Sequence, residues 1–410
     1  MQAAHEAILI GGLLVVLAIA AGLLGARAKA PLLLVFLGLG MLAGEDGPGG
    51  IPFSDFRLTY LLGSVALVVI LFEGGLKTSG AMIRAAGWPA LALATVGTGV
   101  TACILGAATV AMVGGDWRAG LLLGAMMAPT DAAAVASVLR ASGLHLPLRV
   151  DAVLEIESGL NDPMAVFLTL LLVEALLAGQ GFDGGHAVVL FLREMVGGAV
   201  LGVAGGVVMA LAVRRLPAPV SLLPVLVAAA ALALFGAAQM LETSGFLAVY
   251  LAGAIVTRLV GEQGAGEAAV ALERAFEAFG WMAQIGLFLG LGLLVTPHQL
   301  LPLAGIAAAF AGVLIFVARP VSAVLCLRPF GFSWGESAFI GWVGLRGGVP
   351  IYLAIMPVLA GVPGGELGFA AAFVIVLISL VVQGWTIGPA ARVFGLTRGS
   401  VRGFGGLVRK

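Results

Sequence analysis

A run of polar side chains interrupts an apolar stretch of the chain between Glu157 and Pro163, where the sequence reads ESGLNDP. Two carboxylates and an amide within six residues are unusual in a segment that is otherwise hydrophobic. On insertion scales each charge at the centre of a bilayer costs about 3 kcal/mol, so such residues are rarely retained for stability. Ionisable residues within membrane spans mark ion and substrate pathways. The run therefore predicts a site that handles a charged species.

Helical spacing divides these side chains between two faces. Asp162 and Ser158 are four residues apart and share one face, while Asn161 and Glu157 share the adjacent face. Hard cations prefer oxygen ligands such as carboxylates, hydroxyls and amides. We expect Asp162, Ser158 and Asn161 to supply such oxygens to a monovalent cation, with Asp162 as its charged ligand. Thr130, from a different span, is expected to complete the set.

Two predicted spans contain helix breakers near their middle. One holds Pro129 followed by Thr130 and Asp131, and the other holds glycines, a charge and a proline between positions 344 and 350. Proline removes a backbone donor and disfavours helix at the preceding residue. An interrupted helix exposes a positive partial charge at the N-terminus of one half and a negative one at the C-terminus of the other. We expect Asp131 to neutralise the first kind of end and Arg346 the second.

Other charges within predicted spans need partners of their own. Arginine does not readily lose its proton, so Arg319 requires a buried anion, and Glu157 is the candidate. We expect this pair to be structural, joining two helices. Glu73 lies one turn from Lys77, and this spacing fits either an interfacial salt bridge or a functional acid of the cation and proton site.

The composition is that of a membrane protein. Hydrophobic residues make up 61% of the 410 residues and charged residues 10%, and the mean hydropathy is +1.14. Soluble domains average about 25% charged residues. The formal net charge is zero and no basic stripe occurs, so nucleic acid is not an expected partner. No histidine or cysteine spacing indicates a structural metal, and no cofactor is predicted.

Apolar runs cut at charges, glycines and prolines predict an all-α polytopic membrane protein with about thirteen transmembrane helices. The expected spans are 6–27, 30–44, 59–77, 88–114, 118–140, 150–178, 187–213, 220–241, 245–261, 277–296, 301–327, 334–361 and 366–393.

The interrupted spans are the fifth and the twelfth, and each is fifth in its half of the chain. Matching breaks in two six-helix halves predict inverted repeats whose broken helices cross near the bilayer midplane. The repeats would cover about 1–178 and 220–393, with span 187–213 as a linker. The acidic segment 262–277 is expected to be a cytoplasmic connector that is helical at its end.

Basic residues predict the orientation. Most of the 21 lysines and arginines fall in alternate loops if the N-terminus is outside, as the positive-inside rule requires. Residues 1–393 would then form the transmembrane domain, followed by a short basic cytoplasmic tail at 394–410. The first basic residue is Arg27, so the N-terminus lacks the charged start of a signal peptide, and the first span is expected to be retained.

Taken together, these motifs resemble the NhaP and NHE class of monovalent cation:proton antiporters, and the resemblance covers essentially the whole chain. ESGLNDP resembles the span-six signature of the class, Pro129-Thr130-Asp131 its broken fifth span, Arg319 its span-eleven arginine, and Gly344-Leu345-Arg346-Gly347 its broken twelfth span. The resemblance implies thirteen spans, an outside N-terminus, a homodimer and a place in the bacterial inner membrane. The form ESGxNDPMA is most similar to bacterial potassium/proton members, many of which carry a cytoplasmic regulatory extension.

These expectations define a mechanism. Burial favours the neutral form of a carboxyl group, so Asp162 is expected to hold either a proton or a cation. Alternating access would then exchange Na⁺ or K⁺ for H⁺, with no energy source beyond the two gradients. Asn161 stands where a second acid would allow two protons per cycle, which predicts electroneutral one-for-one exchange. Lipid is the remaining expected partner.

The sequence features bear on three alternatives. A sodium-coupled organic-anion carrier would use the same crossed helices for a larger substrate. An ion channel would show a selectivity filter repeated by symmetry, which the sequence lacks. An intramembrane hydrolase would use Ser158 as its nucleophile, but no histidine or lysine lies within a plausible span to activate it. We therefore expect a transporter and not an enzyme.

Overall fold

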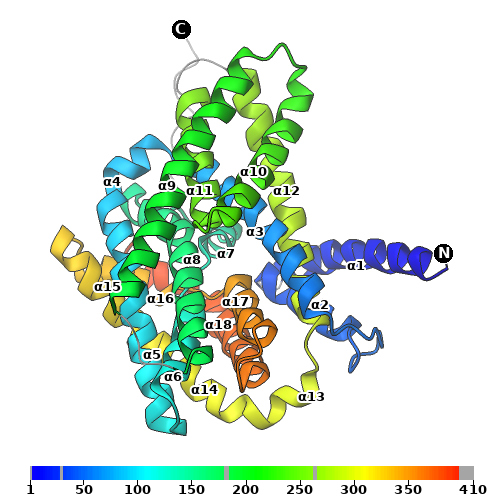
Figure 1. The fold of residues 1–410 in the computed structure, drawn as a ribbon, viewed down its shortest axis with the longest axis vertical. Coiled ribbons are helices and arrows are strands. Elements are labelled where there is room, and N and C mark those ends of the chain that lie inside the picture. The colour runs from blue at the N-terminus through cyan, green and yellow to red at the C-terminus, as the bar shows by residue number, and fades with distance from the viewer. Residues whose placement is uncertain (1, 28–30, 180–183, 262–265, 397–410) are drawn as a thin grey trace.

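The computed structural model describes residues 2–27, 31–179, 184–261 and 266–396, and in these ranges the chain is helical and contains no β-strand. Figure 1 shows the helices arranged as a bundle from which α1 (Gln2–Arg27) extends sideways. Helices satisfy their own backbone hydrogen bonds, which is what a hydrocarbon environment demands. The predicted all-α fold is confirmed. The predicted tail lies largely at 397–410, outside the described residues.

The first part of the chain forms α2 (Leu32–Ala43), α3 (Phe56–Lys77), α4 (Gly80–Ala92), the π-helical segment η1 (Leu93–Gly97), α5 (Thr98–Val113), α6 (Trp117–Met126), α7 (Ala132–Ala141) and α8 (Leu148–Leu177). The second part forms α9 (Gly184–Arg215), η2 (Val220–Leu222), α10 (Leu223–Met240), α11 (Gly245–Val256), η3 (Thr257–Gly261), α12 (Gly266–Leu293), α13 (Pro297–Leu300), η4 (Leu301–Leu303), α14 (Ala304–Val313), η5 (Leu314–Ala318), α15 (Arg319–Leu327), η6 (Arg328–Phe330), α16 (Trp334–Trp342), α17 (Gly348–Leu359) and α18 (Gly365–Val393).

Within the described residues, nine helical stretches are long and apolar enough to cross a membrane. Every predicted span contains helix, although α2 and α11 are shorter and the fifth and twelfth spans are each divided in two. The number of crossings therefore stays a prediction, as do the boundaries of the two repeats.

Two predicted boundaries were wrong. α4 begins at Gly80 and not near 88, because the Ser79 side chain caps it by accepting a hydrogen bond from the Met82 amide at 3.3 Å. α12 begins at Gly266 and not near 277, so most of the acidic connector is part of this helix. The extension is amphipathic: Leu272 and Phe276, four residues apart, are buried while the charged residues face outward.

Small residues allow the central helices to pack closely. Along α9, Gly198, Gly202 and Gly206 lie against the backbone of the chain from Ser244 through α11, where a Cβ atom would overlap main-chain or Cβ atoms. On the other side of α11, Gly253 and Gly75 of α3 approach each other in the same way. Regularly spaced small residues are the usual means of close helix association in membranes. They place α11 firmly between α9 and α3.

The two interrupted spans break where the sequence contains helix breakers. Residues 127–131 separate α6 from α7, and residues 343–347 separate α16 from α17. A second matched feature was not predicted. The spans preceding the breaks both contain a π-helical segment, η1 and η5, and each segment packs against the other span, η1 on α15 and η5 on α5. This pairing fits the proposed repeats.

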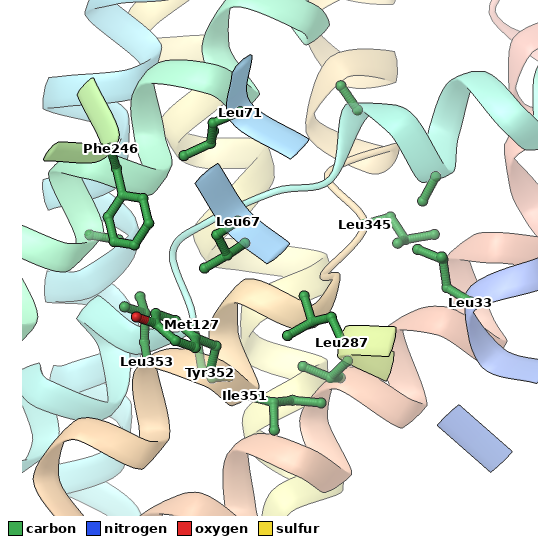
Figure 2. Close-up of a cluster of buried hydrophobic side chains, with 14 of the residues drawn as sticks. Leu33, Leu67, Leu71, Met127, Phe246, Leu287, Leu345, Ile351, Tyr352 and Leu353 are labelled. Carbon is green, nitrogen blue, oxygen red and sulfur yellow. The ribbon is translucent and has the colours of Figure 1, made fainter. Parts of the chain in front are cut away.

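Apolar side chains surround the breaks. Figure 2 shows Met127 and Leu345, one from each break, near side chains of α3, α12 and α17. Both are fully buried. The unwound segments thus lie in the protein interior and not against lipid, which is the condition under which irregular backbone is tolerated at membrane depth.

Candidate ion-binding site

The two breaks cross and are joined through their backbones. The Asp131 amide donates a hydrogen bond to the Leu345 carbonyl at 2.9 Å. The Asp131 side chain accepts a hydrogen bond from the Ala134 amide at 2.9 Å and so caps the N-terminus of α7. Aspartate is favoured at such a position because it satisfies a free amide and opposes the positive end of the helix. Gly347 packs so closely on this carboxylate that a Cβ atom there would overlap Asp131 Oδ2.

Arg346 lies at the opposite kind of helix end. The residue is 1% exposed, and its Nη1 atom donates to the carbonyls of Ala128 and Pro129, at 2.5 and 2.7 Å. These carbonyls follow the C-terminus of α6, where the helix leaves acceptors unsatisfied. The two charges of the broken helices thus lie where opposite partial charges are exposed.

Glu157 is enclosed by hydrogen-bond donors. Arg319 binds both of its oxygens, at 3.0 and 2.8 Å, and both side chains are at most 2% exposed. The Asn161 amide donates to the same carboxylate at 2.7 Å and the Thr130 hydroxyl at 3.2 Å. Arg319 follows η5 and precedes Pro320, whose missing amide accompanies the change of helical pitch. This network joins α8, α15 and the first break.

Asp162 stands apart from that network. Its side chain is 7% exposed, and its buried Oδ1 atom has no hydrogen-bond partner among the described residues. Buried polar atoms are normally paired, and a buried carboxylate oxygen without a donor is costly. Asp162 lines a cavity together with Ser158, Thr130 and Asp131. An unpaired carboxylate facing a cavity is an arrangement suited to a cationic ligand.

The polar edge of the cavity is held by the first break. The Ser158 hydroxyl donates to the Thr130 carbonyl at 2.8 Å and accepts from the Ala132 amide at 3.2 Å. Asn161, which we expected among the ligands, does not line the cavity. Its amide nitrogen binds Glu157 and the Thr130 hydroxyl, so it belongs to the ion-pair network. The two faces of α8 are more distinct than the sequence suggested.

The remaining wall of the cavity comes from α3, α11, α12 and the start of α17. Leu67, Leu71 and Phe288 contribute apolar surface to it, and a low local dielectric constant strengthens electrostatic interactions. Glu73 lies at its edge and accepts a hydrogen bond from Lys77 at 2.6 Å. Both readings of Glu73 therefore have support: it forms a salt bridge, and it faces the same cavity as Asp162.

Sequence reasoning missed other residues in this wall. Glu155, near the start of the sixth predicted span, lines the cavity, as do Tyr250 and Gln284. Glu155 and Asp162 are seven residues apart, two helical turns, and this spacing could have placed them on one face. No comparable signal marks Tyr250 or Gln284, because the positions three and four residues away from each are apolar.

The broken crossed helices and the buried carboxylate define a class of secondary transporter. The family model for the transmembrane domain of sodium/hydrogen exchangers matches residues 13–393, and the chain belongs to this family. The predicted family is thereby confirmed.

The chain is also similar in sequence to individual curated proteins. The chain is 46% identical over 392 residues to the K(+)/H(+) antiporter NhaP of Alkalimonas amylolytica, covering 96% of this chain and 67% of that protein. It is 43% identical over 390 residues to the K(+)/H(+) antiporter NhaP2 of Shewanella oneidensis, covering 94% and 66%. The chain thus spans about two thirds of the length of these relatives.

A solved structure shares the fold. The sodium proton antiporter MjNhaP1 from Methanocaldococcus jannaschii superposes with a TM-score of 0.81, covering 95% of this chain and 99% of that one, at 21% sequence identity.

Proposed function

We propose that this protein exchanges a monovalent cation, Na⁺ or K⁺, for H⁺ across a membrane. The observation that carries the proposal is the unpaired, buried Oδ1 atom of Asp162 in a cavity bounded by the crossed breaks. Family membership and the antiporters among its relatives support a transporter and not an enzyme. The cavity does not favour an organic anion, because carboxylates line it and neither Arg319 nor Arg346 is among the described residues that do so.

Asp162 is the group that proton and cation share. A protonated carboxyl group is neutral and tolerates burial, whereas an ionised one requires a compensating cation. Ser158 and Thr130 lie beside it and supply neutral oxygens. Asp131 contributes charge at the N-terminus of α7 without giving up its capping role. Occupancy by one ion excludes the other, so transport of one drives return of the other.

The exchange is electroneutral in this account. Glu157 is neutralised by Arg319, Asn161 carries no charge, and Asp131 keeps its capping role, so the proposal assigns the exchange to Asp162 alone. One proton then replaces one cation. The rate of exchange in proteoliposomes is expected to be unchanged when a membrane potential is imposed with an ionophore for an ion that the protein does not exchange. A steep voltage dependence would contradict this stoichiometry.

The proposal covers both sodium and potassium, since both ions bind oxygen ligands. The relatives named as K(+)/H(+) antiporters make K⁺ the first cation to test. The experiment is proton flux in proteoliposomes with K⁺, Na⁺, Li⁺ and Rb⁺ in turn. Flux that depends on at least one of these ions supports the proposal, and flux that depends on none of them contradicts it.

The remaining expectations belong to this proposal. We place the protein in a bacterial inner membrane as a homodimer, with the N-terminus outside and the C-terminus in the cytoplasm. Two inverted repeats, about 1–178 and 220–393, would rock around the crossed breaks to expose Asp162 to each side in turn. Cross-linking in membranes and labelling of cysteines introduced into the loops test the dimer and the orientation.

A further inference from the structure

The cavity contains a carboxylate that the exchange at Asp162 does not use. Glu155 lies on the same helix, seven residues earlier, and lines the same cavity. At 1.5 Å per residue the two positions are about 10 Å apart along the helix axis. Ser158 lies between them and also faces the cavity. One face of α8 thus presents a carboxylate, a hydroxyl and a second carboxylate in succession.

The other charged side chains near Glu155 differ from it in their contacts. Glu73 and Lys77 form their ion pair at 2.6 Å, and the Glu73 carboxylate packs on Gly280 of α12. Arg140 and Glu277 line a smaller pocket that shares Glu73 and Lys77 with the main cavity.

Asp151 lies one turn before Glu155 but is exposed and does not line either pocket. Within the described residues, no hydrogen bond or ion pair engages the Glu155 side chain, which is half-buried in the cavity wall. It is therefore a carboxylate available to a mobile ion.

We propose that Glu155 forms a second cation station, through which the cation passes between solution and Asp162. The inference rests on the proposed exchange function and names a further residue that sets its cation affinity. Gln284 and Tyr250 line the cavity with Glu155 and offer an amide and a phenol oxygen. The Tyr250 hydroxyl is 3.0 Å from the Thr78 hydroxyl, which holds the ring in place.

The physical reason for such a station is dehydration. An alkali cation that moves from water into an apolar-walled cavity loses solvation, and a carboxylate on the way offsets that loss in steps. Negative charge in a cleft with low-dielectric walls also concentrates cations there. The unpaired Oδ1 atom of Asp162 marks the end of this path, and Lys77 at the edge is neutralised by Glu73. The net field along α8 therefore favours cation entry.

The test compares Glu155→Gln with Asp151→Asn as the matched control. Both substitutions remove one negative charge from the same end of α8, but only Glu155 faces the cavity. Coulomb's law for charges about 10 Å apart, with an effective dielectric constant between 20 and 80, predicts an affinity change between about twofold and fifteenfold. We expect Glu155→Gln to raise the cation concentration at half-maximal exchange by this factor, with the maximal rate preserved. Glu155→Asp should recover most of the loss.

The measurement is cation-dependent proton flux in proteoliposomes, at constant ionic strength set with choline chloride. Half-maximal concentrations that are equal in Glu155→Gln and the parent protein would overturn the inference. So would an equal rise in Asp151→Asn, because the effect would then be a general surface potential. The inference fails separately from the proposed function: Asp162→Asn tests the latter, and normal exchange by that variant would remove the exchange site itself.

Discussion

Two carboxylates of α8, five residues apart, have opposite surroundings. Glu157 receives four hydrogen bonds, two from Arg319 and one each from Asn161 and Thr130. Asp162 has a buried oxygen with no partner at all in the described part of the chain. Both lie in the same apolar environment, so depth in the membrane does not separate their roles. What separates them is whether the protein itself supplies the counter-charge.

The comparison teaches how a membrane protein uses the cost of a buried charge. For Glu157, the free-energy cost of burying the charge is offset by Arg319. The ion pair also fixes the positions of α8, α15 and the first break relative to one another. On the Asp162 side the protein leaves the charge without a fixed partner, so a proton or a cation must provide it. The first arrangement supports the second, because the Thr130 hydroxyl and Asn161 are held by the Glu157 network.

The largest expected effect is at Asp162, the carboxylate without a fixed partner. Asp162→Asn keeps the size of the side chain but removes the shared negative charge, so exchange should fall to the level of empty vesicles. The protein should remain folded, because no fixed partner of Asp162 loses its counter-charge. Proton flux in proteoliposomes and thermal unfolding in detergent check both halves of the prediction. A variant that still exchanges ions would erase the distinction between the two carboxylates.

Substitution of Glu157, which is paired with Arg319, should have the opposite effect and lower stability more than it alters cation affinity. Glu157→Gln leaves Arg319 buried without an anion, and breaking such a pair by removing one partner costs about 3–5 kcal/mol. We expect a much lower melting temperature in detergent, with cation affinity changed little in the protein that remains folded. The double variant Glu157→Gln/Arg319→Gln is the control, since it strands no charge and should recover part of the stability. An unchanged melting temperature in Glu157→Gln would contradict a structural role.

A smaller effect is expected where the two breaks touch. Gly347→Ala places a methyl group on the Asp131 carboxylate, which must move or displace the start of α17. Overpacking of this kind costs about 1–3 kcal/mol. We expect reduced melting temperature together with weaker cation dependence of flux. Gly286→Ala in α12 is the control, because its Cβ atom would meet nothing within 4 Å. Equal melting temperatures and equal cation dependence of flux in the two variants would show that the contact between Gly347 and Asp131 has no effect.

The smallest expected effect is at Asp131, which caps the N-terminus of α7. Asp131→Asn retains an acceptor for the Ala134 amide, and asparagine caps helices as well as aspartate does. The substitution weakens the interaction with the helix dipole by about 0.3–1 kcal/mol, and it also removes one negative charge from the cavity wall. Cation affinity should fall by about two- to fivefold, with the melting temperature nearly unchanged. Complete loss of exchange would instead make Asp131 a second essential carboxylate and blur the comparison.

Much of this arrangement was predictable from residue types alone. The breaks at Pro129 and around Gly347 follow from local backbone rules, and the positions of Asp131 and Arg346 follow from helix-end electrostatics. The partnership of Arg319 was predictable because a buried guanidinium needs an anion, and Glu157 was available at a similar depth.

Other features depend on tertiary packing that spacing does not encode. Asn161 was predicted to be a ligand, but its amide nitrogen donates to Glu157 and Thr130, and its side chain does not line the cavity. The place of Glu155 in the cavity wall could not be read from its position near the start of the span, because the extent of the cavity along α8 depends on the packing of α3, α11 and α12. The start of α12 was missed because charged residues suggested a connector, although Leu272 and Phe276 form a buried stripe.

The central claim is that one carboxylate, Asp162, is contested by a proton and a cation. The most direct test is proton release from purified protein in weakly buffered detergent when a saturating potassium or sodium salt is added, with a choline salt as reference. We predict that the unaltered protein releases up to one proton per chain and that Asp162→Asn releases none. Equal release by the variant, or cation binding to the unaltered protein with no proton released, would contradict the account.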